Sequence, residues 1–140
     1  MLALLYESLR DTRPDGFIVR REISVVLDDR QRPEPDVMVL RDTGADPRST
    51  WYPADTVELA VEVVSPESQR RDRERKPQLY AGAGIPHFWR VELRDGKPVV
   101  HTYERDVATG QYALTGICRD RPVLSVPFAT DIDLTRAEKF

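Results

Sequence analysis

The sequence predicts a mixed α/β fold of the α+β type, in which two helices flank a mixed, largely antiparallel sheet. Two stretches have the residue spacing of helices, one at the N-terminus and one after residue 68. The other apolar residues alternate with polar ones or form short continuous runs, as in strands, and the second half contains hairpin signals. A length of 140 residues fits one domain, 1–140.

The first half is expected to contain one helix and two strands before a loop. Apolar residues at helical spacing between Leu2 and Leu9 predict a helix that ends near Thr12. The alternation over residues 17–27 predicts one long strand with a solvent-facing side. A short strand over 35–40 follows, and residues 41–54, with their glycine and prolines, are predicted to form a long surface loop.

The second half is expected to alternate buried strands with a helix and hairpins. Residues 57–64 are almost wholly apolar and predict a central strand that is buried on both faces. A helix should follow to about Ala81, and it contains Pro77, which should bend it. Strands are then expected over 86–93, 98–105 and 111–115, with Asp95-Gly96 as the turn of the first hairpin. A final short strand and a polar tail complete the chain.

Composition excludes several classes of protein. The hydrophobic fraction of 40% is typical of an ordinary globular protein. The net charge of −3 argues against nucleic-acid binding over the whole surface. The single cysteine, Cys118, excludes an internal disulfide framework and a multi-cysteine zinc site. No apolar run approaches the roughly 20 residues of a membrane span. We therefore expect a cytoplasmic protein without membrane partners.

Glu62 is the most informative residue, because it interrupts the apolar strand predicted over 57–64. A buried, ionised carboxylate must be paired, hydrogen-bonded or bound to a cation. Asp36 precedes the neighbouring strand, and an Asp and a Glu on adjacent strands are suitable ligands for Mg²⁺, with Mn²⁺ as an alternative ion. The structural alternatives are that Glu62 caps a backbone group or pairs with an arginine, and that Asp36 only stabilises a turn.

The helix after Glu62 provides cations. Asp72, Lys76 and Tyr80 are spaced by four and line one helix face, from which Lys76 could reach the two acids and assist an attacking water. The alternative is an ion pair between Asp72 and Lys76 on a solvated face. The helix also carries a basic run that either grips phosphates or is simply solvated, formed by Arg70, Arg71, Arg73 and Arg75.

Four segments together resemble the Uma-type family of restriction endonucleases, which belongs to the PD-(D/E)XK nuclease-like superfamily. They are Pro35-Asp36-Val37, the segment from Val61 to Ser68, the spacing of Asp72, Lys76 and Tyr80, and the segment from Gly84 to Val91. The resemblance covers most of residues 1–105 and implies a restriction-endonuclease-like fold.

The resemblance implies that Asp36 and Glu62 are the metal-binding acids of the motif. The lysine of the superfamily motif is expected two residues after the glutamate, where this chain has Val64. In the family, too, the lysine comes from the next helix. The resemblance therefore implies that Lys76 is this lysine and that Asp72 and Tyr80 occupy supporting positions. Relative to the family the domain is short at its N-terminus, and by analogy with the superfamily we expect a homodimer.

Three functions are consistent with these residues. The first is a Mg²⁺-dependent endonuclease that cleaves DNA phosphodiester bonds, in which Asp36 and Glu62 hold the metal and Lys76 assists water attack. The second is a catalytically inactive nuclease-like domain that binds DNA or a protein partner. The third is a protein-interaction module that uses the solvent-facing side of the hairpins.

Overall fold

The computed structural model describes residues 1–44, 46–64 and 70–137, with the side chains of residues 70–73 left out of the description. The helices are α1 (Leu2–Thr12) and α2 (Arg70–Gly82), with 3₁₀ turns η1 (Ala54–Thr56) and η2 (Leu134–Ala137). The strands are β1 (Phe17–Arg21), β2 (Ser24–Val26), β3 (Val37–Arg41), β4 (Trp51–Pro53), β5 (Val57–Val64), β6 (His87–Arg94), β7 (Lys97–Arg105), β8 (Tyr112–Arg119), β9 (Val123–Leu124) and β10 (Thr130–Asp131).

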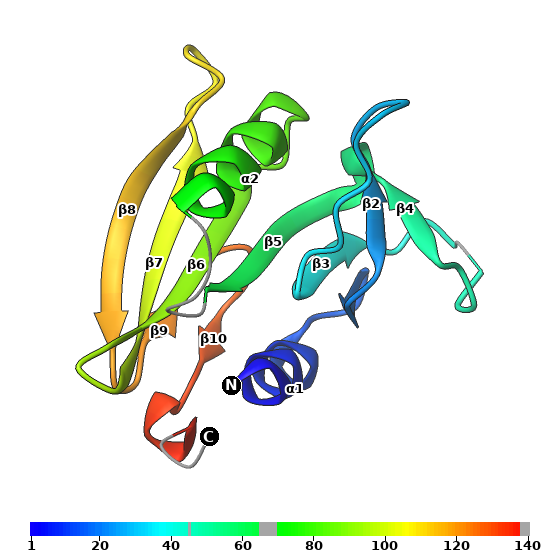
Figure 1. Cartoon of the computed structure of the whole chain (residues 1–140). Helices are drawn as coiled ribbons and strands as arrows, with labels where there is room; N and C mark the ends of the chain where they lie inside the picture. Colours follow the sequence, from blue (N-terminus) through cyan, green and yellow to red (C-terminus); the bar gives the residue numbers. More distant parts are fainter. Residues whose placement is uncertain (45, 65–69, 138–140) are drawn as a thin grey trace.

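A six-stranded sheet in the order β1-β3-β5-β6-β7-β8 forms the centre of the molecule (Figure 1). Its neighbours run antiparallel except for β5 and β6, which are parallel and are connected through α2. A parallel pair requires such a crossover, because the chain must return to the starting end of the first strand before the second strand begins, and a tight turn is too short for this. The predicted α+β class, a largely antiparallel sheet with two helices, is therefore confirmed.

The two helices cover opposite faces of this sheet. Leu5 and Leu9 of α1 pack into one core, together with Val61 of β5 and the C-terminal segment around Ile132. Tyr80 of α2 packs into a second core on the other face. β5 contributes to both cores and lies between β3 and β6, as predicted for a central strand.

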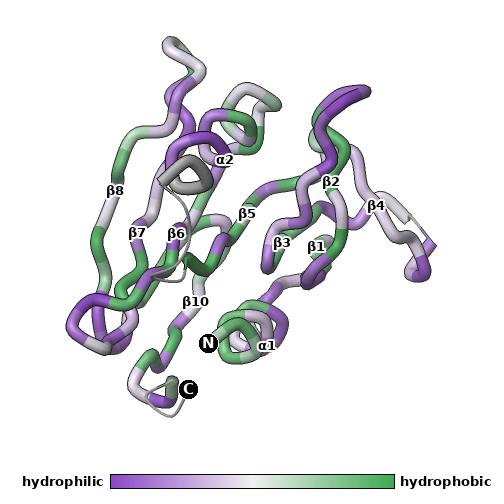
Figure 2. The backbone as a smooth tube through the Cα atoms, viewed as in Figure 1, coloured by the Kyte–Doolittle hydropathy of each residue, from purple (hydrophilic) through white to green (hydrophobic). Residues whose placement is uncertain are grey.

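α2 buries few of its own side chains. Tyr80 and Ala81 near its C-terminal end are buried, whereas the described residues before them are exposed or half-buried. Figure 2 shows hydrophilic residues in α2 before its more hydrophobic C-terminal end. A charged helix surface thus lies directly above the sheet face on which Glu62 is found.

Two predictions for the first half were wrong. Residues 17–27 do not form one strand, because Glu22 adopts a left-handed backbone conformation with φ of 54°. The chain turns there, so that Val19 joins the α1 core while Val25 joins the α2 core. The predicted loop over residues 41–54 contains β4, which pairs parallel with β2 in a separate two-stranded sheet.

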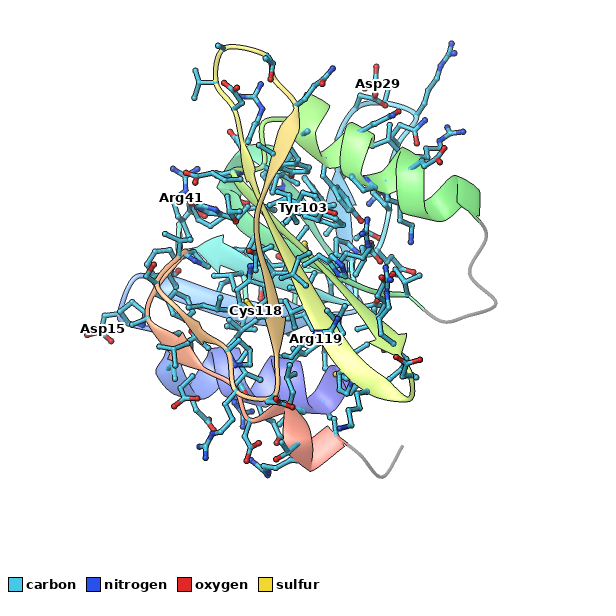
Figure 3. All side chains as sticks on the ribbon, turned by 90° about the vertical axis from the view of Figure 1, so that its left-hand side faces the viewer. Asp15, Asp29, Arg41, Tyr103, Cys118 and Arg119 are labelled. Carbon is cyan, nitrogen blue, oxygen red and sulfur yellow. The ribbon has the colours of Figure 1, made fainter. Side chains whose placement is uncertain are left out.

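The hairpins of the second half agree with prediction, except that β8 extends to Arg119. Asp95 and Gly96 both have positive φ, 52° and 76°, as the predicted tight turn requires. Figure 3 looks at the molecule from the side on which β8 lies, and it shows β8 as the outermost strand.

No helix within the described ranges combines the length and the apolar character that crossing a membrane requires.

Candidate functional site

Asp36 lies directly before β3 and is fixed against β5. The β3–β5 register pairs Val37 with Val61, so one further step places Asp36 opposite Glu62. The backbone N–H of Val63 donates a 2.7 Å hydrogen bond to Asp36 Oδ2. This bond holds the half-buried carboxylate at the end of the two strands, beside the following acid.

Glu62 points from β5 toward α2 and is buried, with an exposed fraction of 7%. The hydroxyl of Tyr80 donates a 2.6 Å hydrogen bond to its Oε1. The ammonium of Lys76 donates to its Oε2 at 3.4 Å. Lys76 and Tyr80 are one helical turn apart and therefore reach the same carboxylate from one face of α2.

The two carboxyl groups are incompletely neutralised. Burial raises the pKa of Glu62 to about 7, and the charge of Asp36 raises it as well, against the lowering effects of Tyr80 and Lys76. Burial also raises the pKa of Asp36, against the hydrogen bond from Val63 and the charge of Lys76. Among the side chains that the structure describes, Lys76 is the cation that faces the two acids, and a bound cation would favour the ionised form of both.

Tyr80 serves as a hydrogen-bond donor here. Burial and the neighbouring Glu62 raise the pKa of its hydroxyl far above its usual range, so it stays protonated. Lys76 is placed differently, since 35% of its side chain is exposed. Its side chain therefore contacts the buried carboxylate while remaining partly accessible to solvent.

The structure brings together four of the predicted residues, namely Asp36, Glu62, Lys76 and Tyr80. The side chains of Arg70, Arg71, Asp72 and Arg73 lie outside the described part of the chain, so their predicted positions stay predictions. Arg75 is exposed on α2.

Sequence reasoning did not identify Glu22, a third acidic residue near this site. Its backbone N–H donates a 3.1 Å hydrogen bond to the carbonyl of Asp36, and its charge contributes to raising the Asp36 pKa. The charged run Arg20-Arg21-Glu22 interrupts the alternation over 17–27 and is the signal that could have indicated the turn. Even so, the described side chains include no group of three or more His, Cys, Asp or Glu placed to hold a metal ion.

Comparison with known families decides the classification. Residues 1–137 match the profile of the Uma2 family, which is described as "Putative restriction endonuclease". The chain belongs to the Uma2 family. The resemblance seen in four sequence segments is thereby confirmed over nearly the whole chain.

A solved structure supports the same fold for this Uma2 protein. It is a crystal structure from Anabaena variabilis, described as "a putative nuclease belonging to DUF820", with a TM-score of 0.60 and 12% sequence identity. The match covers 90% of this chain and 67% of the other. Among curated proteins, the chain has no match.

Proposed function

We propose that this Uma2 protein is a Mg²⁺-dependent endonuclease that cleaves DNA phosphodiester bonds. The supporting observation is the convergence of Asp36, Glu62 and Lys76, which come from two adjacent strands and the helix that follows them. Two acids and an amine in one place are the groups that metal-assisted hydrolysis of a phosphodiester needs. The family description and the nuclease-like fold are consistent with this chemistry.

The chemistry of the site fits a hard divalent cation. Asp36 and Glu62 offer carboxylate oxygens, and burial raises the pKa of both groups despite the nearby charge of Lys76. Mg²⁺ commonly uses one or two protein carboxylates and keeps several waters, so a third acidic ligand is not required. Mn²⁺ accepts the same oxygen ligands and serves as a test ion.

When bound, Mg²⁺ would lower the pKa of a water and offset negative charge on the scissile phosphate. The protein residues have separate tasks. Tyr80 and the Val63 N–H orient the carboxylates of Glu62 and Asp36 through their hydrogen bonds. Lys76 favours the ionised form of Glu62 and, from its partly exposed position, donates toward the attacking water or a phosphate oxygen.

The basic residues of α2 complete the proposal. Next to the cleaved bond, the DNA backbone would contact the four arginines of the basic run, namely Arg70, Arg71, Arg73 and Arg75. These contacts would hold the strand over the two acids. Contacts of this kind release counterions, so binding should weaken as salt increases.

The second candidate is a catalytically inactive nuclease-like domain that binds DNA or a protein partner. One observation favours it, which is that the described residues contain no cluster of three metal-ligating side chains.

Plasmid nicking by the purified protein tests the proposal. We expect cleavage with Mg²⁺ or Mn²⁺ and none with EDTA, and we expect Glu62→Gln to abolish it. Glu58→Gln is the matched control, because Glu58 lies on the same strand but pairs with Arg41 at 3.2 Å, away from the site. Equal cleavage by the wild type and Glu62→Gln would reveal a contaminant, and no cleavage by a folded, metal-loaded wild type would favour the inactive domain.

A further inference from the structure

A cavity of about 590 Å³ lies between α2 and the strands β7 and β8. Its volume is within the range of pockets that hold small ligands. Gln78 of α2 and Gln111 before β8 line it, together with Arg90, Tyr103 and Tyr112. The lining thus combines aromatic rings, side-chain amides and one arginine.

Arg90 connects this cavity to the candidate metal site. In the parallel β5–β6 pair, Arg90 is the register partner of Glu62, and the two side chains leave the same face of the sheet. Adjacent strands are about 4.8 Å apart. A ligand at Arg90 would therefore be a direct neighbour of a group bound at Glu62.

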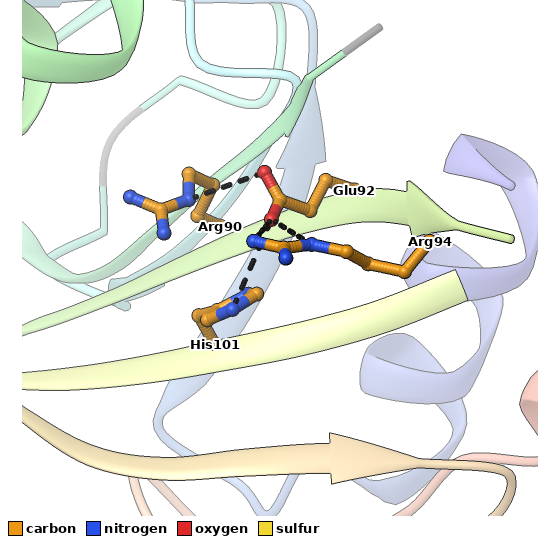
Figure 4. Close-up of polar contacts among 4 residues, drawn as sticks. All are labelled: Arg90, Glu92, Arg94 and His101. Carbon is orange, nitrogen blue, oxygen red and sulfur yellow. Dashed lines mark hydrogen bonds and ion pairs between the residues drawn. The ribbon is translucent and has the colours of Figure 1, made fainter. Parts of the chain in front are cut away.

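The guanidinium of Arg90 is poorly paired for a largely buried cation. Its side chain is 21% exposed, and its Nε makes no hydrogen bond, although it lies 3.7 Å from Glu92 Oε2. Glu92 also accepts hydrogen bonds from Arg94 at 2.7 and 2.9 Å and lies 3.9 Å from His101 (Figure 4). Since Arg90 and Arg94 share the carboxylate of Glu92, Arg90 can pair with an anion from outside the chain.

The aromatic side of the cavity suits a flat ligand. The ring of Tyr112 stacks on Phe88 at 5.6 Å, and its hydroxyl donates to the carbonyl of Ile85, so the ring is held in place. Tyr103 lies under the Arg90 guanidinium, 5.6 Å from ring centroid to Cζ. Gln78 and Gln111 each offer amide donors and an acceptor at the wall of the cavity. Flat rings with donors and acceptors on their edges are the chemistry of nucleobases.

We propose that this cavity binds the nucleotide next to the scissile phosphate, with its phosphate at Arg90 and its unstacked base against Tyr112 and the two glutamines. This inference rests on the proposed endonuclease function, because that function places a DNA strand across Glu62. It assigns Arg90 to substrate binding, and it implies preference for single-stranded DNA or for sites where a base leaves the duplex.

Binding of a short fluorescein-labelled single-stranded DNA in EDTA, followed by fluorescence anisotropy, tests this inference without catalysis. We expect Arg90→Gln to raise the dissociation constant about tenfold. Arg94→Gln is the matched control, because it removes another arginine that pairs with Glu92 but does not line the cavity. Its dissociation constant should stay within roughly twofold of the wild-type value.

The base contribution has its own comparison. Tyr112→Leu should weaken binding about tenfold, and Tyr112→Phe, which keeps the ring, should not. If circular dichroism shows that Tyr112→Leu is unfolded, Gln78→Glu is tested in its place. Gln78 is an exposed helix residue that lines the cavity, so the new negative charge should weaken DNA binding. An abasic strand of the same length should bind the wild type more weakly than the intact strand.

Equal binding by Arg90→Gln and Arg94→Gln would overturn the proposal, and so would equal affinity for the abasic and intact strands. The two proposals can fail separately. Binding that depends on Arg90, with no metal-dependent nicking, would leave the cavity assignment standing and remove the endonuclease. If nicking requires Glu62 but Arg90→Gln changes neither nicking nor DNA binding, the endonuclease stands and the cavity assignment is removed.

Discussion

The Tyr80 hydroxyl donates a 2.6 Å hydrogen bond to Oε1 of Glu62, and so joins helix α2 to the central strand at the candidate site. Tyr80→Phe removes this donor, so that Oε1 of the buried Glu62 loses its hydrogen bond from Tyr80. We expect a loss of about 2 kcal/mol in the free energy of unfolding, measured by urea denaturation, and weaker Mn²⁺ binding at neutral pH. Tyr112→Phe, which loses a bond to a backbone carbonyl instead, should leave Mn²⁺ affinity unchanged. Identical Mn²⁺ affinities for both variants would contradict the assigned role of Tyr80.

The raised pKa of Glu62 predicts how stability depends on pH without metal. Its pKa is about 7 in the folded protein and 4.5 in the reference state, so the folded protein binds this proton more tightly than the unfolded chain. The contribution is full below pH 4.5 and is lost as the pH rises through about 7. The loss amounts to about 3 kcal/mol.

Urea unfolding in EDTA across this pH interval checks the prediction by comparing the wild type with Glu62→Gln. The difference in unfolding free energy between them should move in favour of Glu62→Gln as the pH rises. A wild type that gains stability relative to Glu62→Gln over the same interval would show that Glu62 is not a destabilised carboxylate.

Glu22 is strained by its position at the turn between β1 and β2. A left-handed conformation costs a residue with a Cβ about 1 kcal/mol, and glycine avoids this cost. We therefore expect Glu22→Gly to be more stable than Glu22→Ala by about 1 kcal/mol in chemical denaturation. Equal stability of the two variants would mean that the backbone at residue 22 is not left-handed.

Lys76 has a role in cleavage that is separable from metal binding. Because its charge competes with a cation for Glu62, Lys76→Met should bind Mn²⁺ at least as tightly as the wild type at pH 8, where the carboxylates are ionised. The same variant should nick plasmid at least about a hundredfold more slowly, since it lacks the donor. Lys97→Met, which removes an exposed lysine at the β6–β7 hairpin, is the control for lost charge. Normal nicking by Lys76→Met would exclude Lys76 from the reaction.

The elements with strong local patterns were predictable from the sequence. The apolar run of β5 lies between turn residues, so its central, doubly buried position followed from its composition. The meeting of Asp36, Glu62 and Lys76 followed from the resemblance of the motifs, together with the strand order that such motifs imply. In each case the residues that carry the signal are close in sequence to the element that they specify.

The unpredicted features depend on contacts between distant segments or on a single backbone angle. The positive φ of Glu22 moves the following side chains to the other core. The charged run Arg20-Arg21-Glu22 interrupts the alternation there, but it does not specify this backbone angle. β4 exists because β2 pairs with it across a long loop. The cavity beside Arg90 needs the β7–β8 register, which shifts between Thr102 and Tyr103. Apart from the charged run at residues 20–22, these features leave no local mark in the sequence.

Calorimetric titration with Mn²⁺ measures whether Asp36 and Glu62 together hold a divalent cation. We predict saturable binding to the wild type and to Glu58→Gln at neutral pH, and a loss of at least about tenfold in affinity in both Asp36→Asn and Glu62→Gln. Folding of each variant is checked by circular dichroism. If all four folded proteins bind Mn²⁺ alike, the two carboxylates are not a metal site and the account is wrong.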